Sequence, residues 1–593
     1  MTVTPSPRRP LRLWPGVVAA GLIVLVRFVL PLVVPDAMMV TVLGGLAGGL
    51  VILVWWVFFS RAAWVERLGA VALMIAAVAA TARLVHPSVA TGMMGLMLPL
   101  YAIPVLGVAL VAWAVVTRGR PAGFRRVTLA ATLLLACGLF TLVRTDGISG
   151  AGGSELHWRW SPSAEERLLA EARGNSPLSP LRAEAGARGN SPLRTDEARG
   201  SSPLPTGADW PGFRGPERDG VVRGGVQIAT NWSDAPPAEL WRRPVGPAWS
   251  SFAVAGGLFY TQEQRGEEEL VVGHRLDTGE PVWRHADAVR FWESNAGAGP
   301  RATPAVSRGR VYALGATGLL NALDAADGRR LWSRDVAADT GMKTPMWGFA
   351  GSPLVAGDVV LVAAAGRLAA YDAATGQPRW SGPERGGGYS SPHRLSLGGV
   401  DQVLLLSDAG VLSVTPADGA VLWEHAWDGA AIVQPALTAD GDLLLATGGP
   451  SGGLGLRRLA VTRGPGGWAV AERWTSRGLK PYFSDFVVHR GHAFGIEGSL
   501  LACIELEGGE RQWKDGRYGS GQLLLLPDQD LLLVLGEQGG LALVSAMPDG
   551  FRELARFPAI RGKTWNHPVL AGDVLLVRNS EEMAAFRLAR AGR

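Results

Sequence analysis

Two stretches of the sequence, ALDAADGRRLW at residues 322–332 and AYDAATGQPRW at residues 370–380, decide the fold. In each, an apolar strand leads into an Asp-x-x-x-Gly type turn, and the next strand ends on a tryptophan. The two tryptophans, Trp332 and Trp380, are 48 residues apart. A repeat of 40 to 50 residues with about four short strands is typical of a β-propeller blade.

Similar units continue from Trp210 to the C-terminus. The closing aromatic residues are Trp241, Trp283, Trp332, Trp380, Trp423, Trp474 and Trp513, with Phe557 in the eighth place. A large flat side chain at a fixed place suits packing against the turn of a neighbouring blade, so we expect these residues to be structural. Polar segments that should begin the innermost strands occur at Ser251, Thr303, Ser352, Ser391, Gln434, Asp485, Gln522 and Asn566. Eight starts and eight ends predict an all-β propeller of eight blades over residues 210–593.

The ends of this domain should close the ring. The strand that ends at Trp241 comes first, whereas the inner strands of the last blade, over residues 568–588, come at the end. We expect the two to pair in one sheet, because pairing removes an open strand edge.

Residues 1–144 have a different composition, with twelve arginines, no lysine and only two acids, Asp36 and Glu66. Five apolar runs come near the ~20 residues that a membrane-spanning helix needs. They are Leu13–Val34, Ala37–Ser60, Val65–Val85, Gly92–Val116 and Val127–Val143. The sequence thus predicts an α-helical transmembrane domain of about five helices. Arg27, which has no acidic partner within the runs, is interpreted as packed against protein or facing the interface, and transport is not supported.

The arginines also predict orientation. They precede the first run and lie between the second and third and between the fourth and fifth runs. Cytoplasmic loops hold an excess of positive charge, so the N-terminus is expected in the cytoplasm and the propeller in the periplasm or extracytoplasmic space of a bacterial inner membrane. Without this segment the totals of 57 basic and 52 acidic residues become 45 and 50. The basic pI is therefore a topology signal, and no nucleic-acid partner is expected.

Residues 145–209 are expected to connect the two domains. Ser163 and Glu166 have capping-box spacing for a short helix over Ala164–Ala172. The near copies ARGNSPL (172–178), ARGNSPL (187–193) and ARGSSPL (198–204) follow, and their composition is typical of a flexible tether. A ligand-binding role for these copies is the alternative.

The A-x-D-x-x-T-G-x-x-x-W pattern of the two deciding stretches resembles the tryptophan-docking repeat of the pyrroloquinoline quinone (PQQ) propeller superfamily. That superfamily contains PQQ-dependent alcohol dehydrogenases and the propeller lipoprotein of the outer-membrane β-barrel assembly machinery. The stretches WPGFRGPERDG (210–220) and YTQEQRGEEELVV (260–272) are more narrowly similar to membrane-anchored PQQ-like repeat proteins. The resemblance covers residues 155–593.

For a dehydrogenase, the resemblance implies a quinone on a tryptophan floor, a lid of two adjacent cysteines, a calcium or lanthanide ion held by Glu, Asn and Asp, and an aspartate base. Cys137 and Cys503 are not adjacent, and Asp485 is the one acid among the predicted strand starts. A hard cation prefers several carboxylate oxygens. His489 and His492 should point to opposite faces of a strand and make a poor metal pair. We therefore predict no catalytic residue, no metal and no cofactor, with PQQ and calcium only if the chain is a dehydrogenase.

The loops that lead into the innermost strands are richer in chemistry than the blades. They carry aromatic and basic residues that should emerge on one face: Trp249, Phe291, Trp292, Arg301, Lys343, Trp347, Tyr389, Lys480, Tyr482, Arg517, Tyr518, Lys563 and Trp565. Three of the four lysines of the chain are in this set. Such a face suits a polar or anionic ligand, a glycan or a partner peptide, and the alternative is a set of aromatic plugs that fill the channel mouth.

These observations favour a non-catalytic, membrane-tethered propeller that serves as a binding or assembly scaffold. The alternative is a membrane-bound PQQ-dependent dehydrogenase of alcohols or sugars. A sensor that signals through its membrane helices is a third possibility, but no cytoplasmic output domain is present in the sequence.

Overall fold

The structure is a computed structural model of the 593-residue chain, and it describes residues 11–34, 38–150, 152–174, 209–224, 227–427, 429–448 and 455–591. The chain divides into two compact units. The first comprises Met1–Pro162 together with Glu293–Gly297, and the second comprises Ser163–Trp292 together with Ala298–Arg593. The ARGNSPL copies, apart from the start of the first, lie outside the described residues.

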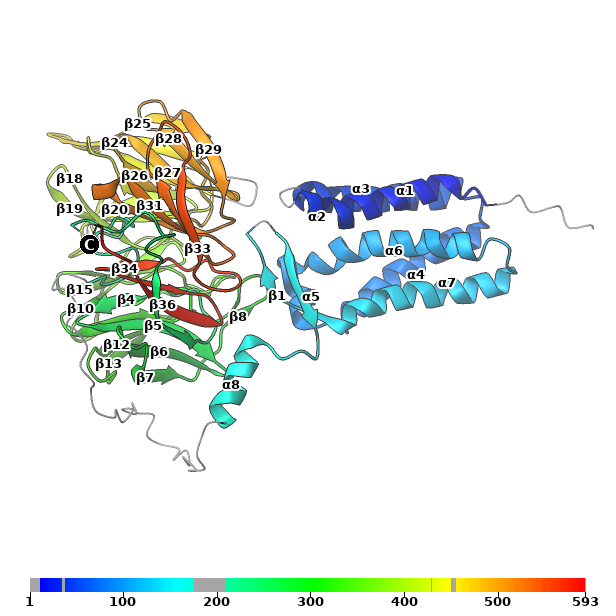
Figure 1. The fold of residues 1–593 in the computed structure, drawn as a ribbon, viewed down its shortest axis with the longest axis horizontal. Coiled ribbons are helices and arrows are strands. Elements are labelled where there is room, and N and C mark those ends of the chain that lie inside the picture. The colour runs from blue at the N-terminus through cyan, green and yellow to red at the C-terminus, as the bar shows by residue number, and fades with distance from the viewer. Residues whose placement is uncertain are drawn as a thin grey trace, which may run out of the picture. The chain divides into compact units, whose positions relative to one another are not determined.

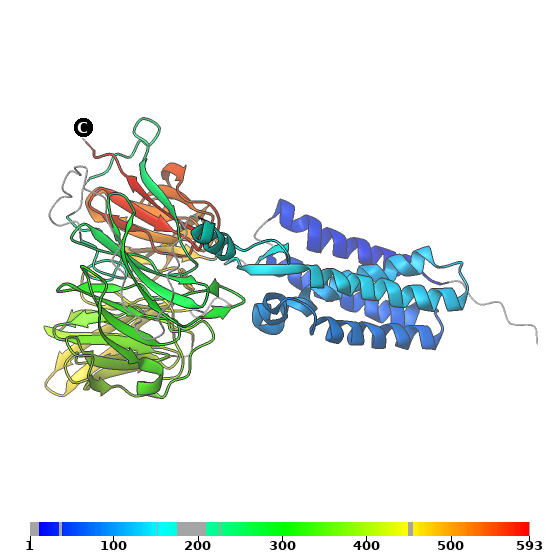
Figure 2. The same ribbon diagram turned by 90° about the horizontal axis from the view of Figure 1, so that it is seen from below.

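The first unit is helical, with one β-hairpin after the last long helix (Figures 1 and 2). Its elements are α1 (Trp14–Val24), η1 (Leu25–Val29), α2 (Leu30–Val33), α3 (Met38–Val54), η3 (Trp55–Phe59), α4 (Trp64–Thr81), α5 (Pro87–Thr91), η4 (Gly92–Gly95), α6 (Met97–Val116), α7 (Ala122–Gly138), η5 (Leu139–Leu142), β1 (Val143–Ile148) and β2 (Ser154–Trp158). Among the described residues, five helices are long and apolar enough to span a membrane: Trp14–Val33, Val40–Phe59, Trp64–Thr81, Met97–Val116 and Ala122–Leu142.

Two predicted runs differ from the helices at their starts. The fourth helix begins at Met97 instead of Gly92, because Met93 and Met94 have left-handed φ angles of 51° and 57° that interrupt the helix. The fifth begins at Ala122, directly after Pro121. The β1–β2 hairpin was not predicted, since its strands lie in a region read as helix and linker.

Arg27 is packed against protein, as one of the two sequence interpretations held. Arg27 is 7% exposed, and its guanidinium carbon lies 4.6 Å from the centroid of the Tyr101 ring. The backbone of Gly45 packs closely beside it, since a Cβ at Gly45 would lie 3.2 Å from Arg27 Cδ. An arginine held by an aromatic face in this way needs no transport role.

The second unit begins with α8 (Ala164–Gly174) and continues into the propeller. The predicted capping box is present, because Ser163 N donates to Glu166 Oε2 (2.6 Å) and Glu166 N donates to Ser163 Oγ (3.1 Å). Glu165 ties the helix to the propeller through Arg290, with two contacts of 2.8 Å.

Eight four-stranded antiparallel sheets make up the described part of the propeller. In strand order they are β4 (Ala253–Ala255), β5 (Leu258–Arg265), β6 (Glu268–Arg275) and β7 (Pro281–Asp287); β10 (Ala305–Ser307), β11 (Arg310–Leu314), β12 (Leu319–Asp324) and β13 (Arg330–Asp335); β14 (Leu354–Ala356), β15 (Val359–Ala364), β16 (Arg367–Asp372) and β17 (Pro378–Ser381); β18 (His393–Leu397), β19 (Val400–Ser407), β20 (Gly410–Val414) and β21 (Val421–Ala426); β22 (Ala436–Leu437), β23 (Leu443–Thr447), β24 (Gly455–Gly464) and β25 (Gly467–Ser476); β26 (Val487–His489), β27 (His492–Glu497), β28 (Leu500–Glu505) and β29 (Arg511–Arg517); β30 (Gln522–Leu526), β31 (Leu531–Leu535), β32 (Gly540–Ser545) and β33 (Glu553–Pro558); and β34 (Val569–Ala571), β35 (Val574–Arg578), β36 (Glu582–Arg587) and β3 (Ala238–Pro244). Three short elements lie between blades or strands: β8 (Trp292–Glu293) and β9 (Gly297–Ala298) form a hairpin, α9 (Val336–Thr340) follows β13, and η6 (Pro527–Gln529) follows β30.

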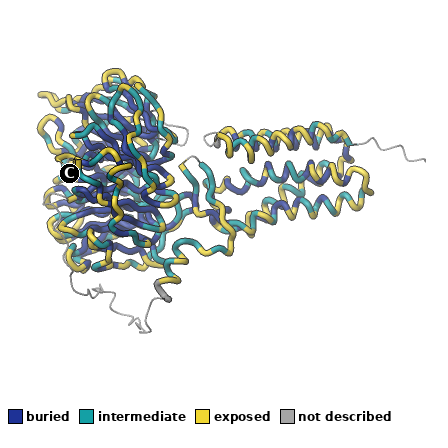
Figure 3. Tube along the Cα trace, in the orientation of Figure 1, coloured by how far each residue is buried: buried dark blue, intermediate teal, exposed yellow. Residues whose placement is uncertain are grey.

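The last sheet confirms the predicted ring closure. β3, from the start of the domain, pairs antiparallel with β36 near the C-terminus, with Ala238 opposite Arg587. Buried residues concentrate in the inner strands, whereas the outermost strands and the loops carry many exposed residues (Figure 3). The strands of every blade therefore contribute to a continuous packed ring.

The closing tryptophans bind the blades together. The indole of Trp283 donates to the carbonyl of Ala325 in the next blade (3.0 Å), and a Cβ at Gly328 would lie 2.3 Å from its ring. The same ring-to-glycine contact joins Trp241 to Gly279, Trp332 to Gly376, Trp380 to Gly419 and Trp474 to Gly509. These turn glycines have φ angles of 69° to 77°, so glycine is favoured both by the backbone and by the indole above it.

Three closing aromatics depart from this pattern. Trp513 donates to the Met547 carbonyl (3.0 Å) and packs against Phe551 at a centroid distance of 5.8 Å, without a glycine of the described residues beneath its ring. Trp423 donates to Gln402 Oε1 of its own blade (2.8 Å), because the next blade has the long β24–β25 hairpin in place of the glycine turn. Phe557 has no N–H to donate and instead packs edge-on against Trp232 and Phe586, at centroid distances of 5.4 and 5.1 Å.

We predict that Gly328→Ala destabilises the propeller more than Gly309→Ala does. The two glycines have nearly equal φ angles of 71° and 72°, but nothing lies within 4 Å of a Cβ at Gly309. Both substitutions carry the backbone strain, and only the first pushes against Trp283. We expect an additional loss of about 1–3 kcal/mol, measured by thermal unfolding of the purified chain in detergent. Equal losses would contradict the docking role of Trp283.

Candidate functional site

The innermost strands line the centre of the ring. β4, β10, β14, β18, β22, β26, β30 and β34 are the first strands of their blades, and several contact the first strand of the neighbouring blade. Since every blade repeats the same strand order, the loops that lead into these strands lie at the same end of the channel. We call this end the mouth face.

The residues that begin the innermost strands hydrogen bond from blade to blade. The backbone N–H of Ser251 donates to Thr303 Oγ1 (3.0 Å), Thr303 N donates to Ser352 Oγ (2.9 Å), and Ser352 N donates to Ser391 Oγ (2.9 Å). Further round, Gln434 N donates to Asp485 Oδ1 (2.7 Å), and Asp485 N donates to Gln522 Oε1 (3.2 Å).

The remaining steps use side-chain amides. The amide of Gln434, oriented so that both its atoms are satisfied, pairs with the backbone of Ser391. Gln522 Nε2 donates to the Trp565 carbonyl (3.3 Å), and Asn566 Nδ2 donates to the Ser250 carbonyl (2.7 Å). All eight predicted strand-start residues are at most 4% exposed. They form a closed polar girdle in which the side chains bond to neighbouring blades.

The segment that precedes the first blade crosses the opposite end of the channel. We call residues 210–222 the plug segment. Trp210 pairs with Val254 through two backbone bonds (2.9 and 2.7 Å), and Val306 N donates to the Pro211 carbonyl (2.7 Å). Val222 N donates to the Leu525 carbonyl (2.8 Å). The plug segment therefore bridges blades on different sides of the ring.

Two arginines of the plug segment reach into the girdle. Arg214 and Arg218 are 3% and 6% exposed, and both have left-handed φ angles, of 60° and 58°. Arg214 Nη2 donates to the Phe486 carbonyl (2.8 Å), and Arg214 Nη1 lies 3.4 Å from Asp485 Oδ1. Arg218 donates to the carbonyls of Pro353 (2.9 Å) and Ser352 (3.0 Å). The sequence analysis assigned no role to these two arginines. The signal that could have indicated them is two positive charges in a Gly- and Pro-rich segment directly before the first blade.

The buried charges shift several pKa values. Burial raises the pKa of Asp485, but Arg214 and His567 outweigh burial and hold the pKa below its usual range. His567 Nε2 lies 3.2 Å from Asp485 Oδ2. Burial lowers the pKa of Arg218 to about 9, with a contribution from Arg214, and burial and the two arginines lower the pKa of His393 to about 3. The centre of the ring thus carries an ionised aspartate, two arginines and a neutral His393.

These residues do not fit the calcium and PQQ that the family resemblance implies for a dehydrogenase. The oxygens of Asp485 already face Arg214, His567 and the backbone N–H of Gln434, so a guanidinium takes the place that a cation would need. Within the described residues, no group of three or more His, Cys, Asp or Glu side chains is placed to hold a metal ion. Cys137 and Cys503 are both buried, in different units, and form no lid.

Aromatic and basic side chains gather above the girdle at the mouth face. Trp249 and Trp565 stack with their ring centroids 4.6 Å apart, and Phe483 lies 5.0 Å from Trp565. Lys563 Nζ lies 5.8 and 5.1 Å from the centroids of the two indoles. The Trp565 N–H is fixed by Glu537 Oε1 at 2.8 Å. We call Trp249, Phe483, Lys563 and Trp565 the mouth cluster, and its four members are half-buried.

A second group continues from this cluster. Tyr482 lies 5.3 Å from Phe483, and burial together with Tyr389 raises the pKa of Tyr482. Tyr389 in turn lies 4.9 Å from Trp347. Arg301 donates to the Trp347 carbonyl (3.2 Å) and lies 5.1 Å from the Phe291 ring. Five further predicted mouth residues thus contact one another or the mouth cluster through ring, cation–π or hydrogen-bond contacts.

The other predicted residues have different partners. Lys480 lies 3.9 Å from Glu497, which also bonds to Arg511 (2.8 Å) and Lys514 (2.9 Å). Arg517 is exposed and donates to Ser499 Oγ (3.4 Å). Lys343 and Trp292 are exposed, and Tyr518 is 4% exposed in the core. A place in a loop before an innermost strand is therefore not sufficient to bring a side chain into contact with the mouth cluster.

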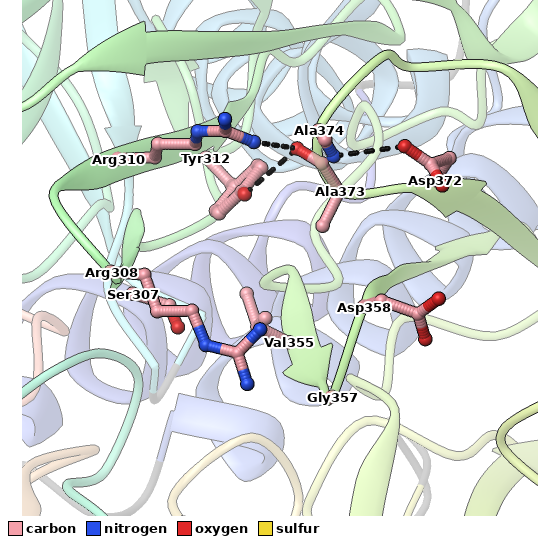
Figure 4. Close-up of a pocket in the computed structure, with 10 residues that line it drawn as sticks. All are labelled: Ser307, Arg308, Arg310, Tyr312, Val355, Gly357, Asp358, Asp372, Ala373 and Ala374. Carbon is pink, nitrogen blue, oxygen red and sulfur yellow. Dashed lines mark hydrogen bonds between the residues drawn. The ribbon is translucent and has the colours of Figure 1, made fainter.

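A pocket of about 240 Å³ opens at the opposite end, between the blades of β10–β13 and β14–β17 (Figure 4). Arg310 and Tyr312 point to the Ala373 carbonyl and donate to it at 2.8 and 3.0 Å. Trp332 donates to the same carbonyl (3.2 Å), so the pocket borders a blade-docking contact.

We predict that Arg214→Met destabilises the chain by about 3–5 kcal/mol at pH 7.5, because it leaves Asp485 buried without its cation. The pKa of Asp485 is depressed in the folded state, so its charge contributes stability above about pH 4 that is lost as the pH falls through the folded pKa. Without Arg214 the pKa of Asp485 should rise, and the deficit in melting temperature should be smaller at pH 5 than at pH 7.5.

The control for this experiment is Arg223→Met in the following turn. Arg223 is 55% exposed and pairs with Asp219 at the surface (2.5 Å), so its loss should change stability by less than about 1 kcal/mol. Equal effects of the two substitutions, or a deficit at Arg214 that does not depend on pH, would contradict the buried ion pair.

Comparison with known proteins finds one family match within the propeller. Residues 230–383 and 267–515 match the family described as outer membrane protein assembly factor BamB. Among curated proteins, none matches the chain. The structure of BamB from Moraxella catarrhalis is 14% identical with a TM-score of 0.43, over 59% of this chain and 98% of that chain.

Quinohemoprotein alcohol dehydrogenases from Pseudomonas putida HK5 and Comamonas testosteroni are 15% and 13% identical, with TM-scores of 0.47 and 0.46. Each comparison covers 65% of this chain and 81% of the dehydrogenase chain. The chain is thus similar over residues 230–515 to the BamB family, and its described residues form an eight-bladed propeller, preceded by helices of which five are apolar enough to span a membrane.

Proposed function

We propose that the chain is a membrane-tethered, non-catalytic scaffold that binds a protein partner through the mouth cluster. The observation that carries the proposal is the bonded interior of the channel. Arg214 and Arg218 fill its centre from within the chain, and Asp485 is engaged by Arg214 and His567. Because these interior side chains already contact one another, we infer that a partner binds at the mouth face, where the propeller presents aromatic and basic side chains.

The helices supply the tether. Five apolar spans support a membrane location for residues 1–144, which in this proposal lie in a bacterial inner membrane, with residues 145–209 as the connection and residues 210–593 as the propeller. The arginines at the starts of α1, α4 and α7 mark the cytoplasmic side, so the N-terminus is cytoplasmic and the propeller extracytoplasmic. This is the arrangement that a scaffold for periplasmic proteins requires.

The mouth cluster favours a partner with acidic and aromatic or aliphatic side chains. Lys563 holds a positive charge over two indole rings, and half-buried tryptophans are typical of the centre of protein interfaces. The family description names an assembly factor, which supports a protein partner over a small substrate. A polar ligand or glycan is the competing occupant of the same surface.

The test is site-specific photo-crosslinking in membranes of the natural host. A benzophenone side chain replaces Arg561, which is exposed two residues before Lys563, and the matched control replaces Arg308, which is exposed in the β10–β11 turn at the opposite end of the channel. We expect a discrete protein crosslink from position 561 alone.

The crosslink should fall at least fivefold when Trp249→Ala and Lys563→Ala are added, and Lys563→Arg should largely preserve it because an arginine also lies over an indole. The melting temperature of each variant separates a lost contact from a lost fold. Equal crosslinks from both positions, or a crosslink that ignores Trp249 and Lys563, would contradict the proposal.

A further inference from the structure

The β1–β2 hairpin begins where the fifth apolar helix ends. η5 ends at Leu142, and β1 starts at Val143. Trp158, the last residue of β2, lies opposite Val143, and the following Arg159 N donates to the Leu142 carbonyl (2.8 Å). The hairpin register therefore fixes Trp158 at the level of the end of the helix.

Two tryptophans of this hairpin are exposed. Trp158 and Trp160 are 55% and 68% exposed, and their rings stack with centroids 5.1 Å apart and an interplanar angle of 8°. Leu156, on the same face of β2 as Trp158, is 46% exposed. The described surface here is a small apolar patch that includes two stacked indole rings.

Polar contacts hold the hairpin against the same end of the helical unit. Arg159 Nη1 donates to the Leu84 carbonyl beyond α4 (3.1 Å), and Thr145 N donates to Ser88 Oγ in α5 (3.0 Å). Arg144 donates to the Ser161 carbonyl after the two tryptophans, with Nε at 3.3 Å. The position of the stacked pair is thus set by the helices and not by a loose loop.

A second aromatic belt lies at the other end of the helices. Trp14, Trp64 and Phe124, near the starts of α1, α4 and α7, are 63%, 58% and 51% exposed. Each has an arginine over its ring, namely Arg12 at 5.6 Å, Arg67 at 4.9 Å and Arg120 at 5.8 Å. Aromatic residues beside arginines are typical of the cytoplasmic membrane interface.

The distance between the two belts matches a bilayer. From Phe124 to Val143 the chain advances about 19 residues, which at ~1.5 Å per helical residue is roughly 29 Å. The hydrocarbon core of a bilayer is ~30 Å thick. Trp158, level with Val143, is therefore placed one hydrocarbon thickness from the belt that contains Phe124.

We propose that Trp158 and Trp160 form an interfacial anchor that inserts into the phospholipid headgroup and glycerol layer of the extracytoplasmic leaflet. The flat apolar rings meet the acyl-chain boundary while the indole N–H groups reach hydrated headgroups. The anchor fixes the depth of the last span and holds the chain at the membrane before α8 begins. This inference rests on the proposed spanning arrangement of the helices.

The test uses the full chain labelled with 5-fluorotryptophan in phospholipid nanodiscs. The ¹⁹F resonances of Trp158, Trp160, Trp64 and Trp468 are assigned through single Trp→Phe variants. Line broadening is then measured with a lipid that carries a nitroxide near its glycerol group and, separately, with a water-soluble gadolinium chelate. Trp468 is the matched control, because it is partly exposed at the tip of the β24–β25 hairpin of the propeller.

We expect the nitroxide lipid to broaden Trp158, Trp160 and Trp64 at least threefold more than Trp468, and the chelate to affect Trp468 most. If Trp64 responds to the lipid while Trp158 and Trp160 respond only to the chelate, the anchor is refuted and the spanning helices stand. If Trp64 also fails to respond to the lipid, the spanning arrangement itself is refuted, and the anchor with it.

Discussion

The contact between an indole and a glycine turn is the constraint on which the rest of the propeller depends. Each tryptophan that makes this contact lies on a turn whose glycine has a positive φ and no room for a Cβ. The indole also donates to a carbonyl of the neighbouring blade, so spacing and tilt between blades are fixed together. Five of the eight closing aromatics make this contact, and the ring closes where β3 pairs with β36.

That fixed spacing determines what happens at the centre. The innermost strands come close enough for a backbone N–H of one blade to reach a side chain of the next, and Ser, Thr, Gln and Asp serve this purpose. Side chains used in this way already have a partner within the chain. The plug segment then adds two buried arginines, whose Nη groups donate to carbonyls, and Arg214 also pairs with Asp485. These contacts offset part of the energetic cost of burying the two charges, whereas the Nε atoms of both arginines are buried without a hydrogen-bond partner.

The sequence was sufficient for the fold because the fold is periodic. A tryptophan at the end of each blade and a polar residue at the start of each inner strand are local signals, and the positions of Trp332 and Ser352 follow directly from them. The predicted eight blades, their closure and the five apolar helices are confirmed. Trp423 is an exception. It donates to Gln402 of its own blade, because the following blade has a longer hairpin in place of the glycine turn.

The site was harder to predict because it depends on contacts between distant residues. Lys480 and Lys563 occupy similar loops, but Lys480 lies beside Glu497 whereas Lys563 lies over two indole rings. Arg214 has no periodic signal at all, and its role appears only when residue 486 is placed beside it. The β1–β2 hairpin was not predicted for a related reason. Its strands are short, and they are held by contacts with Leu84 and Ser88, which lie more than 50 residues away in the sequence.

Arg214 and Arg218 of the chain itself reach the interior of the channel, where a quinone would bind in a dehydrogenase. Whether they exclude a quinone can be measured by calorimetric titration of the purified full-length chain in detergent with PQQ, in the presence of calcium. We expect no saturable heat of binding at micromolar PQQ. Stoichiometric binding that requires calcium and is lost in Asp485→Asn would contradict the scaffold proposal and favour the dehydrogenase.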